Sequence, residues 1–291
     1  MPQPAVASEP WAGRRRRAEE LLDRWPFAAE VLTLYRAVAA VQEQAFAAAQ
    51  AAPPDPTAVP AYVAQRVLPE VIAATAASGP PRLAGRVAER FHTLHAESVV
   101  AQWLAGEELP AVDRYLARAA AAPVLEALGP AAGSACAGPR DKRHCPNCGG
   151  LPQLSWTKLS PEDLVTPRRH LECGRCASTW SYPRLTCAAC GEDDPSLLTT
   201  FGEEAARDRG DGGPAIRGAA GPHAASPVGP AMHFPHMRVD ACWACSRYLL
   251  HIDLRRDPRA VPLVDEMAAI PLDLYARERG MGKIQPNLMG C

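Results

Sequence analysis

The chain has 291 residues, with 31 basic and 32 acidic side chains and a formal net charge of −1. This length allows two or three domains of ordinary size. The charges nearly balance on both sides of residue 140, whereas binding to phosphate backbones relies on an excess of positive charge. The composition therefore argues against a nucleic-acid partner.

An arginine run, Arg14–Arg17, lies near the N-terminus and is soon followed by Glu19 and Glu20. A secretory or twin-arginine signal needs an apolar stretch behind its basic residues, and none follows this run. The sequence also lacks a run of about 18 apolar residues that would span a membrane. We therefore expect a cytoplasmic protein without direct membrane insertion.

The first part of the chain, residues 1–135, predicts an all-α domain of about four to six helices. The clearest signal is in residues 27–50, where apolar side chains recur every three to five positions on one face. We interpret this domain as a scaffold. The other expected helices are 61–77, kinked or restarted at Pro69, then 81–104, and finally 110–128, interrupted at Pro123.

The composition then changes to turn residues, short β-prone runs and cysteine pairs, which are typical of small sheets stabilised by metal. Residues 203–230 are rich in Gly, Ala, Pro and Arg and have almost no large apolar side chain. We predict a low-complexity insertion there. Residues 248–254 alternate like a strand, and residues 262–279 predict one or two C-terminal helices.

Eight of the ten cysteines form four Cys-x-x-Cys pairs, here called knuckles one to four. Both thiolates of a knuckle can bind one metal ion, and a second knuckle completes a tetrahedral site. Only ten residues separate knuckles two and three, whereas 24 separate knuckles one and two, enough for a hairpin. We therefore predict two metal sites, from sequential pairs of knuckles. Their ligands are Cys145, Cys148, Cys173 and Cys176 in the first site, and Cys187, Cys190, Cys242 and Cys245 in the second.

The residues around the knuckles fit this interpretation. Glycines at 149, 174 and 191 are expected to let the knuckle backbone turn, and the aromatic side chains beside the cysteines to pack around the sites. His144 and His170 flank the knuckles and would bind metal only if a cysteine were displaced. Cys136 and Cys291 stand alone and are interpreted as incidental thiols. The aromatic residues are Trp180, Tyr182, Trp243 and Tyr248.

The chemistry of such sites is limited. A complete four-cysteine shell leaves no open position for water or substrate, and the sequence contains no P-loop, G-x-G-x-x-G motif or recognisable Ser/His/Asp arrangement. We therefore expect no enzymatic activity. Zinc would be inert in these sites, whereas iron could carry one electron.

The ordered motifs His144–Gly149, His170–Cys176, Cys187–Cys190, Cys242–Leu249 and Pro271–Leu288 resemble the FdhE family, accessory proteins of respiratory formate dehydrogenase. The resemblance runs from about residue 14 to the C-terminus, and the knuckles are its specific part. The insertion at 203–230 departs from the shorter loop expected in the family.

This resemblance implies an α+β, multidomain fold: a helical domain, 1–135, followed by two tandem rubredoxin-like (zinc-ribbon-like) metal domains, 140–185 and 186–291. It implies two metal ions, which are iron in the native host. Because thiolate sites bind Zn²⁺ more tightly than Fe²⁺, recombinant protein can contain zinc instead. The implied role is maturation of formate dehydrogenase through binding of its catalytic subunit in the cytoplasm, before export. Two alternatives are a zinc-ribbon nucleic-acid-binding module and a stand-alone rubredoxin-like electron carrier.

Overall fold

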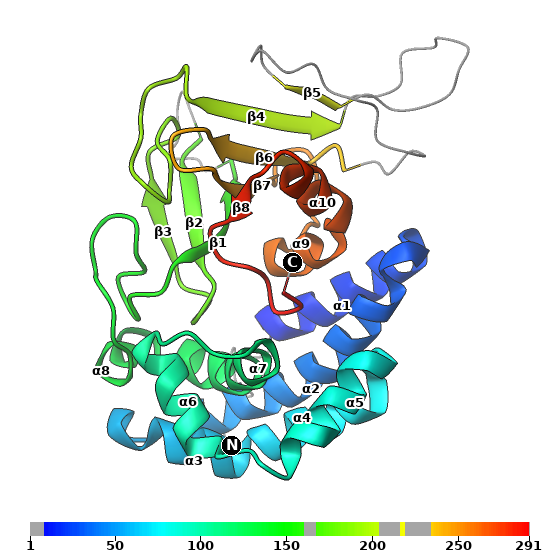
Figure 1. Ribbon diagram of the computed structural model, residues 1–291, viewed down its shortest axis with the longest axis vertical. Coiled ribbons are helices and arrows are strands. Elements are labelled where there is room, and N and C mark those ends of the chain that lie inside the picture. Colours follow the sequence, from blue (N-terminus) through cyan, green and yellow to red (C-terminus); the bar gives the residue numbers. More distant parts are fainter. Residues whose placement is uncertain (1–8, 160–166, 204–215, 219–233, 291) are drawn as a thin grey trace, which may run out of the picture.

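The computed structural model describes residues 9–159, 167–203, 216–218 and 234–290. Helices form the N-terminal region and a sheet forms most of the C-terminal region, as predicted, and the two are stacked (Figure 1). The described helices before the sheet are α1 (Glu9–Arg24), α2 (Ala29–Ala51), α3 (Val59–Arg66), α4 (Leu68–Ser78), α5 (Pro81–Phe91), α6 (Ala96–Ala105), α7 (Ala111–Leu128) and α8 (Ala132–Ala135).

The longest described helix, α2, has the apolar face predicted for residues 27–50. Leu34, Tyr35 and Val38 on this face are buried, and the helix packs against α1, α4 and α7. Val31 and Val41, from the same predicted stripe, are half-buried. The helix therefore lies at the centre of the helical layer.

Two predicted helices are each divided in the structure, and for the first of them the predicted restart at Pro69 is confirmed. The segment 61–77 forms α3 and α4, and Pro69 lies in the first turn of α4, where its missing N–H costs no helical hydrogen bond. The segment 81–104 forms α5 and α6, separated by a turn in which Arg90 Nη1 donates to the Thr93 carbonyl over 2.8 Å. The helical region therefore has more and shorter helices than the periodicity predicts.

Pro123 lies inside α7 without ending it, so the predicted interruption is wrong. Because proline has no N–H, the carbonyl four residues earlier, that of Ala119, loses its helical partner. Gln42 of α2 replaces that partner, since its Nε2 donates to the Ala119 carbonyl over 2.8 Å in the buried interior. A side chain from a neighbouring helix thus satisfies the group that the proline leaves unpaired.

The strands form one mixed sheet in the order β3-β2-β1-β7-β6-β4-β5, with β8 paired to β7. All described pairs are antiparallel except β1 with β7 and β7 with β8. The strands are β1 (Pro152–Thr157), β2 (Arg169–Cys173), β3 (Thr179–Tyr182), β4 (Leu198–Glu203), β5 (Ile216–Gly218), β6 (Met237–Cys242), β7 (Arg247–Asp253) and β8 (Gly282–Lys283).

The two halves of the sheet repeat one order of elements: a knuckle, two antiparallel strands, a knuckle and a third strand. The first half uses β1, β2 and β3, and the second uses β4, β6 and β7. Parallel pairing of β1 with β7, with Leu154 opposite Leu250, joins the halves into one sheet. The boundaries predicted at 140–185 and 186–291 stay a prediction. Most of the predicted insertion at 203–230 lies outside the described residues, although β5 within it pairs with β4.

The C-terminal helices α9 (Pro262–Ala268) and α10 (Ile270–Glu278) follow the sheet where helices were predicted. α9 packs against α1, α2 and β1, so it joins the two layers (Figure 1). One continuous buried core includes residues of both layers and the cysteines of the first knuckle pair. Among the described helices, none has the length and apolar character needed to cross a membrane.

Candidate metal centres

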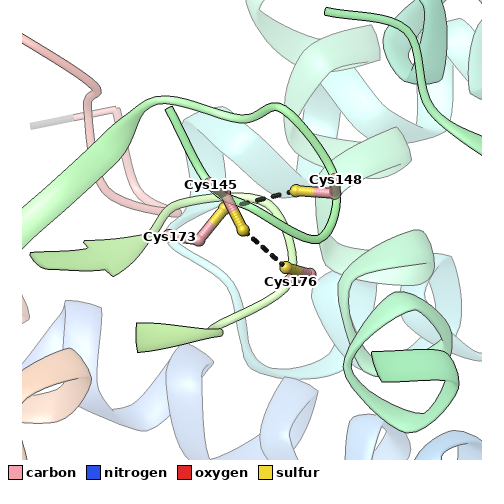
Figure 2. Close-up of side chains that lie close together, drawn as sticks. All are labelled: Cys145, Cys148, Cys173 and Cys176. Carbon is pink, nitrogen blue, oxygen red and sulfur yellow. Dashed lines mark hydrogen bonds between the residues drawn. The ribbon is translucent and has the colours of Figure 1, made fainter. Parts of the chain in front are cut away.

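The first tetrad contains the cysteines of knuckles one and two, as the sequence predicts (Figure 2). All four side chains are buried, with at most 1% exposed. The Sγ atoms of Cys145 and Cys176 are 3.6 Å apart, and those of Cys148 and Cys173 are 3.4 Å apart. Knuckle one precedes β1, and knuckle two joins β2 to β3. The β1–β2 hairpin therefore brings the knuckles together.

The second tetrad repeats this arrangement near the protein surface. Knuckle three precedes β4, and knuckle four joins β6 to β7. The Sγ atoms of Cys187 and Cys245 are 3.8 Å apart, and so are those of Cys190 and Cys242. Cys190 is exposed and Cys245 is half-buried. The second site is therefore accessible to solvent in a way that the first is not.

The residue directly after each knuckle has a positive φ angle. These residues are Gly149 (71°), Ala177 (54°), Gly191 (87°) and Ser246 (54°). The N–H of Gly149 donates to the Cys145 carbonyl over 2.9 Å, and the N–H of Ala177 donates to the Cys173 carbonyl over 3.1 Å. The predicted turning role of glycine therefore holds for knuckles one and three. In knuckle two the turn is made at Ala177.

Gly174 has another reason to be glycine. A Cβ atom added there would lie 2.7 Å from Cγ of Gln285, a separation that would force the Gln285 side chain to shift. The glycine therefore permits close packing between knuckle two and the tail.

The sulfur geometry fits a bound metal. A tetrahedral ion with Zn–S bonds of about 2.3 Å separates its sulfurs by about 3.8 Å, close to the observed contacts, whereas a disulfide bond needs about 2.05 Å. Burial raises the pKa of the Cys173 and Cys242 thiols, so thiolates packed this closely need a cation to offset their charge. Each tetrad could therefore hold one metal ion, and the four ligands leave no open coordination position.

Two arginines support the knuckles through hydrogen bonds, and the sequence did not predict this role. Arg175, inside knuckle two, donates from Nη1 to the carbonyls of Ala137 (3.0 Å) and Cys148 (3.1 Å). Arg143, before knuckle one, donates to the Ala189 carbonyl of knuckle three over 3.1 Å. Arg175 thus ties knuckles one and two to the segment after α8, and Arg143 links the two tetrads. Nothing in the local pattern distinguishes these arginines from surface residues.

The aromatic residues near the knuckles have different roles. Tyr182 is buried and donates to the Cys187 carbonyl over 3.1 Å, and Trp180 donates to the Lys142 carbonyl over 3.0 Å. Tyr248 is fully buried, but its hydroxyl donates to Asp273 of α10 over 2.8 Å. Trp243 is 37% exposed beside the second tetrad.

The other candidate ligands lie outside the tetrads. Nδ1 of His144 is 2.7 Å from an oxygen of Asp141, and His170 stacks on Trp156 with 4.3 Å between ring centroids. Cys136 is buried as a free thiol. Cys291 lies outside the described residues.

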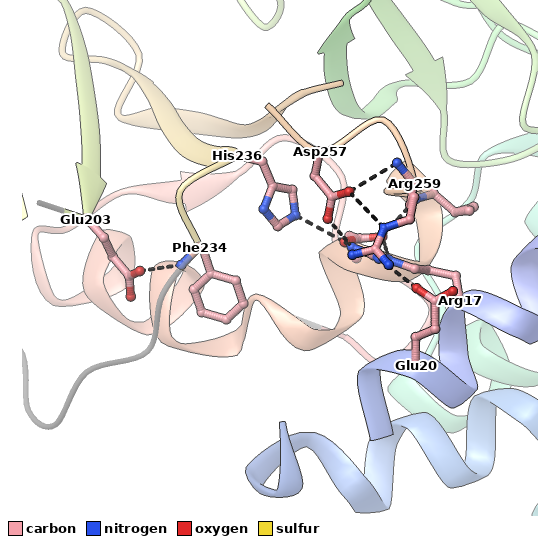
Figure 3. A network of polar contacts seen from close by, with 9 residues as sticks. Arg17, Glu20, Glu203, Phe234, His236, Asp257 and Arg259 are labelled. Atoms are coloured by element: carbon pink, nitrogen blue, oxygen red, sulfur yellow. Dashed lines mark hydrogen bonds and ion pairs between the residues drawn. The ribbon is translucent and has the colours of Figure 1, made fainter. Parts of the chain in front are cut away.

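A third group of potential ligands, His236, Asp257 and Asp265, surrounds Arg17 (Figure 3). The Arg17 guanidinium donates to both Asp265 oxygens at 2.5 and 2.9 Å and to Asp257 at 2.8 Å. His236 Nε2 lies 3.1 Å from Asp265. Because an internal cation already occupies this cluster, it joins α1 to α9 as an ion network. The N-terminal arginine run therefore contributes to the interior of the fold.

Comparison with known proteins agrees with this architecture. The family model described as "FdhE, C-terminal domain" matches residues 229–289. An FdhE homologue of Aquifex aeolicus is 29% identical over 149 residues, 51% of this chain and 42% of the relative. One from Haemophilus influenzae is 26% identical over 140 residues, 48% of this chain and 36% of the relative. The alignments thus span about half of this chain and less than half of each relative.

The crystal structure of the FdhE protein from Pseudomonas aeruginosa shares the fold, with a TM-score of 0.60 and 21% identity over 99% of this chain and 97% of that one. Fold and sites thus define a class of protein in which a helical layer supports a sheet with two four-cysteine centres. The resemblance noted from the order of the knuckles is confirmed by the family model over residues 229–289 and by the relatives, so this part of the chain is similar to the FdhE family.

Proposed function

We propose that this protein is a non-catalytic accessory protein for the maturation of formate dehydrogenase. It binds the catalytic subunit of that enzyme in the cytoplasm, before export. The observation that carries the proposal is the ordered set of knuckles and flanking residues, from His144 to Leu288, which resembles the FdhE family. The family-model match over residues 229–289 and the FdhE relatives support it. Two closed four-cysteine shells also favour a protein that recognises a partner over one that transforms a substrate.

The two metals in this proposal are iron in the native host, each held by one tetrad. When bound, iron in four thiolates supplies a one-electron couple. The exposed second tetrad, with Cys190 at the surface, is the site through which a partner would reach that couple. Thiolate sites bind Zn²⁺ more tightly than Fe²⁺, so recombinant protein is expected to contain zinc.

A contact region for the catalytic subunit is the groove between the helical layer and the first tetrad. Its volume is about 550 Å³, and its walls include Trp103, Glu107 and Glu108 from the α6–α7 region and Arg175 of knuckle two. The Arg175 guanidinium lies 5.5 Å from the centre of the Trp103 ring. A fixed aromatic and charged surface of this kind binds with little ordering cost.

A pull-down under anaerobic conditions tests this proposal. The catalytic subunit, expressed separately, should be retained by the wild-type protein. Glu108→Arg should weaken retention, because it reverses an exposed charge at the groove, whereas Glu70→Arg on the exposed surface of α4 should not. Absence of retention by the wild type, with formate oxidation intact in a strain lacking the gene, would contradict the proposal.

A second candidate function, a stand-alone rubredoxin-like electron carrier, is favoured by the exposure of Cys190 and Trp243. The optical spectrum of anaerobically purified protein separates the two candidates when combined with the pull-down. A carrier would show a reversible iron–thiolate spectrum and no stable complex with the catalytic subunit.

A further inference from the structure

A cavity of about 170 Å³ lies beside the second tetrad. Its walls include residues of strands β2, β4, β6 and β7 and of the segment before knuckle three, and two of the tetrad's cysteines, Cys187 and Cys242. The volume suits a group of a few atoms, because ordinary ligand pockets are about 300–1,000 Å³.

The walls of this cavity carry more positive than negative side chains. The only carboxylate among the lining residues is that of Asp240, which accepts from Arg238 Nε over 2.9 Å and lies 3.5 Å from Arg169 Nη2. This carboxylate and the double negative charge of four thiolates around a divalent ion together leave one of the four guanidinium charges unbalanced. The lining arginines are Arg169, Arg184, Arg238 and Arg247.

Arg169 is the buried member of this group. Its side chain is 5% exposed, and its Nη1 donates to the Thr186 carbonyl over 3.1 Å. Its Nε–H has no acceptor among the described residues. A buried donor without an acceptor is unfavourable, and more so when the group is charged, so this donor favours a ligand that supplies an acceptor.

Arg184 lies at the mouth of the cavity and is exposed. No ion pair to its guanidinium is found among the described residues. The side chain can therefore close over a bound anion. Thr199 and Thr200 of β4 line the same cavity.

We propose that this cavity binds a phosphate-sized oxyanion, either free or as the end group of a larger molecule. Guanidinium groups bind such oxygens through paired, charge-assisted hydrogen bonds. The ligand lies next to the second tetrad, so its binding couples to the sulfur environment of that site. The competing explanation is that the arginines only balance the charge of the four thiolates.

Calorimetric titration of the metal-loaded full-length protein with inorganic phosphate, at constant ionic strength, tests the proposal. One saturable site is expected. Arg184→Ala should weaken phosphate binding roughly tenfold, and Arg169→Lys by a similar factor, because lysine keeps the charge and loses the planar donor set. The matched control is Arg66→Ala, an exposed arginine of α3 away from the cavity, which should bind phosphate like the wild type.

Glycerol 3-phosphate serves as a second ligand in the same titrations. Tighter binding than inorganic phosphate would support an end-group site, and equal or weaker binding would support a site for the free anion. The proposal would be overturned by the absence of saturable binding up to about 10 mM, by equal losses in the Arg66 and Arg184 variants, or by an Arg184 variant that loses metal without losing phosphate affinity. If the Arg169 variant does not fold, the exposed Arg184 decides the result.

Discussion

The two four-cysteine centres are made from the same elements, but they differ in their surroundings. The first is enclosed in the core shared by the helical layer and the sheet, with all four cysteines buried. The second is at the surface, with Cys190 exposed and Cys245 half-buried. The same ligand set therefore serves as an interior element of the fold in one place and as an accessible centre in the other.

This difference shows that the cysteine pattern does not determine how exposed a metal site is or how strongly metal binding is linked to folding. The knuckles fix coordination, because each Cys-x-x-Cys turn aims two sulfurs at one point. The protein around them decides how far metal binding is linked to folding and how readily solvent reaches the sulfurs. We expect metal loss from the first site to affect the whole core and metal loss from the second to stay local.

The largest expected effect is that of Cys173→Ser. Structural metal sites bind with about 10–16 kcal/mol, comparable to the whole stability of a domain, so loss of a buried ligand should prevent cooperative folding of the sheet. Cys190→Ser, the matched change in the exposed tetrad, should remove one metal and leave a cooperative unfolding transition. Circular dichroism during urea denaturation, with metal analysis, measures both. Equal destabilisation by the two variants would remove the distinction between the sites.

Arg17→Met should have the next largest effect. Removal of one partner from a buried ion cluster typically costs about 3–5 kcal/mol, and here it leaves Asp265, which is fully buried, without its guanidinium. Arg16→Met, on the exposed side of the same helix, should change the free energy of unfolding by about 0.5 kcal/mol or less.

The Arg17 variant also sharpens the comparison of the two centres. Because α1 packs in the core that contains the first tetrad, the variant should speed metal release from the first site and leave the second unchanged. Faster release from the second site alone would contradict the prediction that the helical layer stabilises the first site.

Chelator challenge should separate the two centres by rate. An excess of chelator should remove one metal roughly tenfold faster or more than the other, because the second site opens without disturbing the core. The fast phase should be missing in Cys190→Ser. A single phase that releases both metals together would show that the sites open as one unit.

The smallest effect concerns Trp243, whose Nε1 donates to Thr199 Oγ1 over 2.8 Å beside the second tetrad. Trp243→Phe keeps an aromatic side chain but removes this donor, and loss of the hydrogen bond should cost about 0.5–1.5 kcal/mol. Release of the second metal should become modestly faster, and release of the first should not change. A larger effect on the first metal would contradict the local role assigned to this residue.

The sequence predicts the tetrads well because their chemistry is local. Each knuckle supplies two sulfurs, and the spacing between knuckles one and two is that of a hairpin. These features predict that Cys145 and Cys173 lie in one tetrad, and they do. The helical N-terminal region follows equally from periodicity. The passage of α7 through Pro123 was not predictable, because it depends on Gln42, a residue far away in the chain.

The joining of the two halves into one sheet could not be predicted from the sequence either. It depends on the pairing of Leu154 with Leu250, strands that no local signal connects. The arginine run at the N-terminus was considered only in relation to an export signal, whereas Arg17 pairs with acidic residues more than 200 positions later. Long-range pairing of this kind is set by the packed fold and leaves no periodic trace.

The metal content of anaerobically purified protein, measured by elemental analysis without chelator, tests the central claim most directly. The account predicts two metal ions per chain in the wild type. It predicts one in Cys190→Ser, with the remaining ion in the buried site. One ion or none in the wild type, or two in Cys190→Ser, would contradict the assignment of two four-cysteine centres.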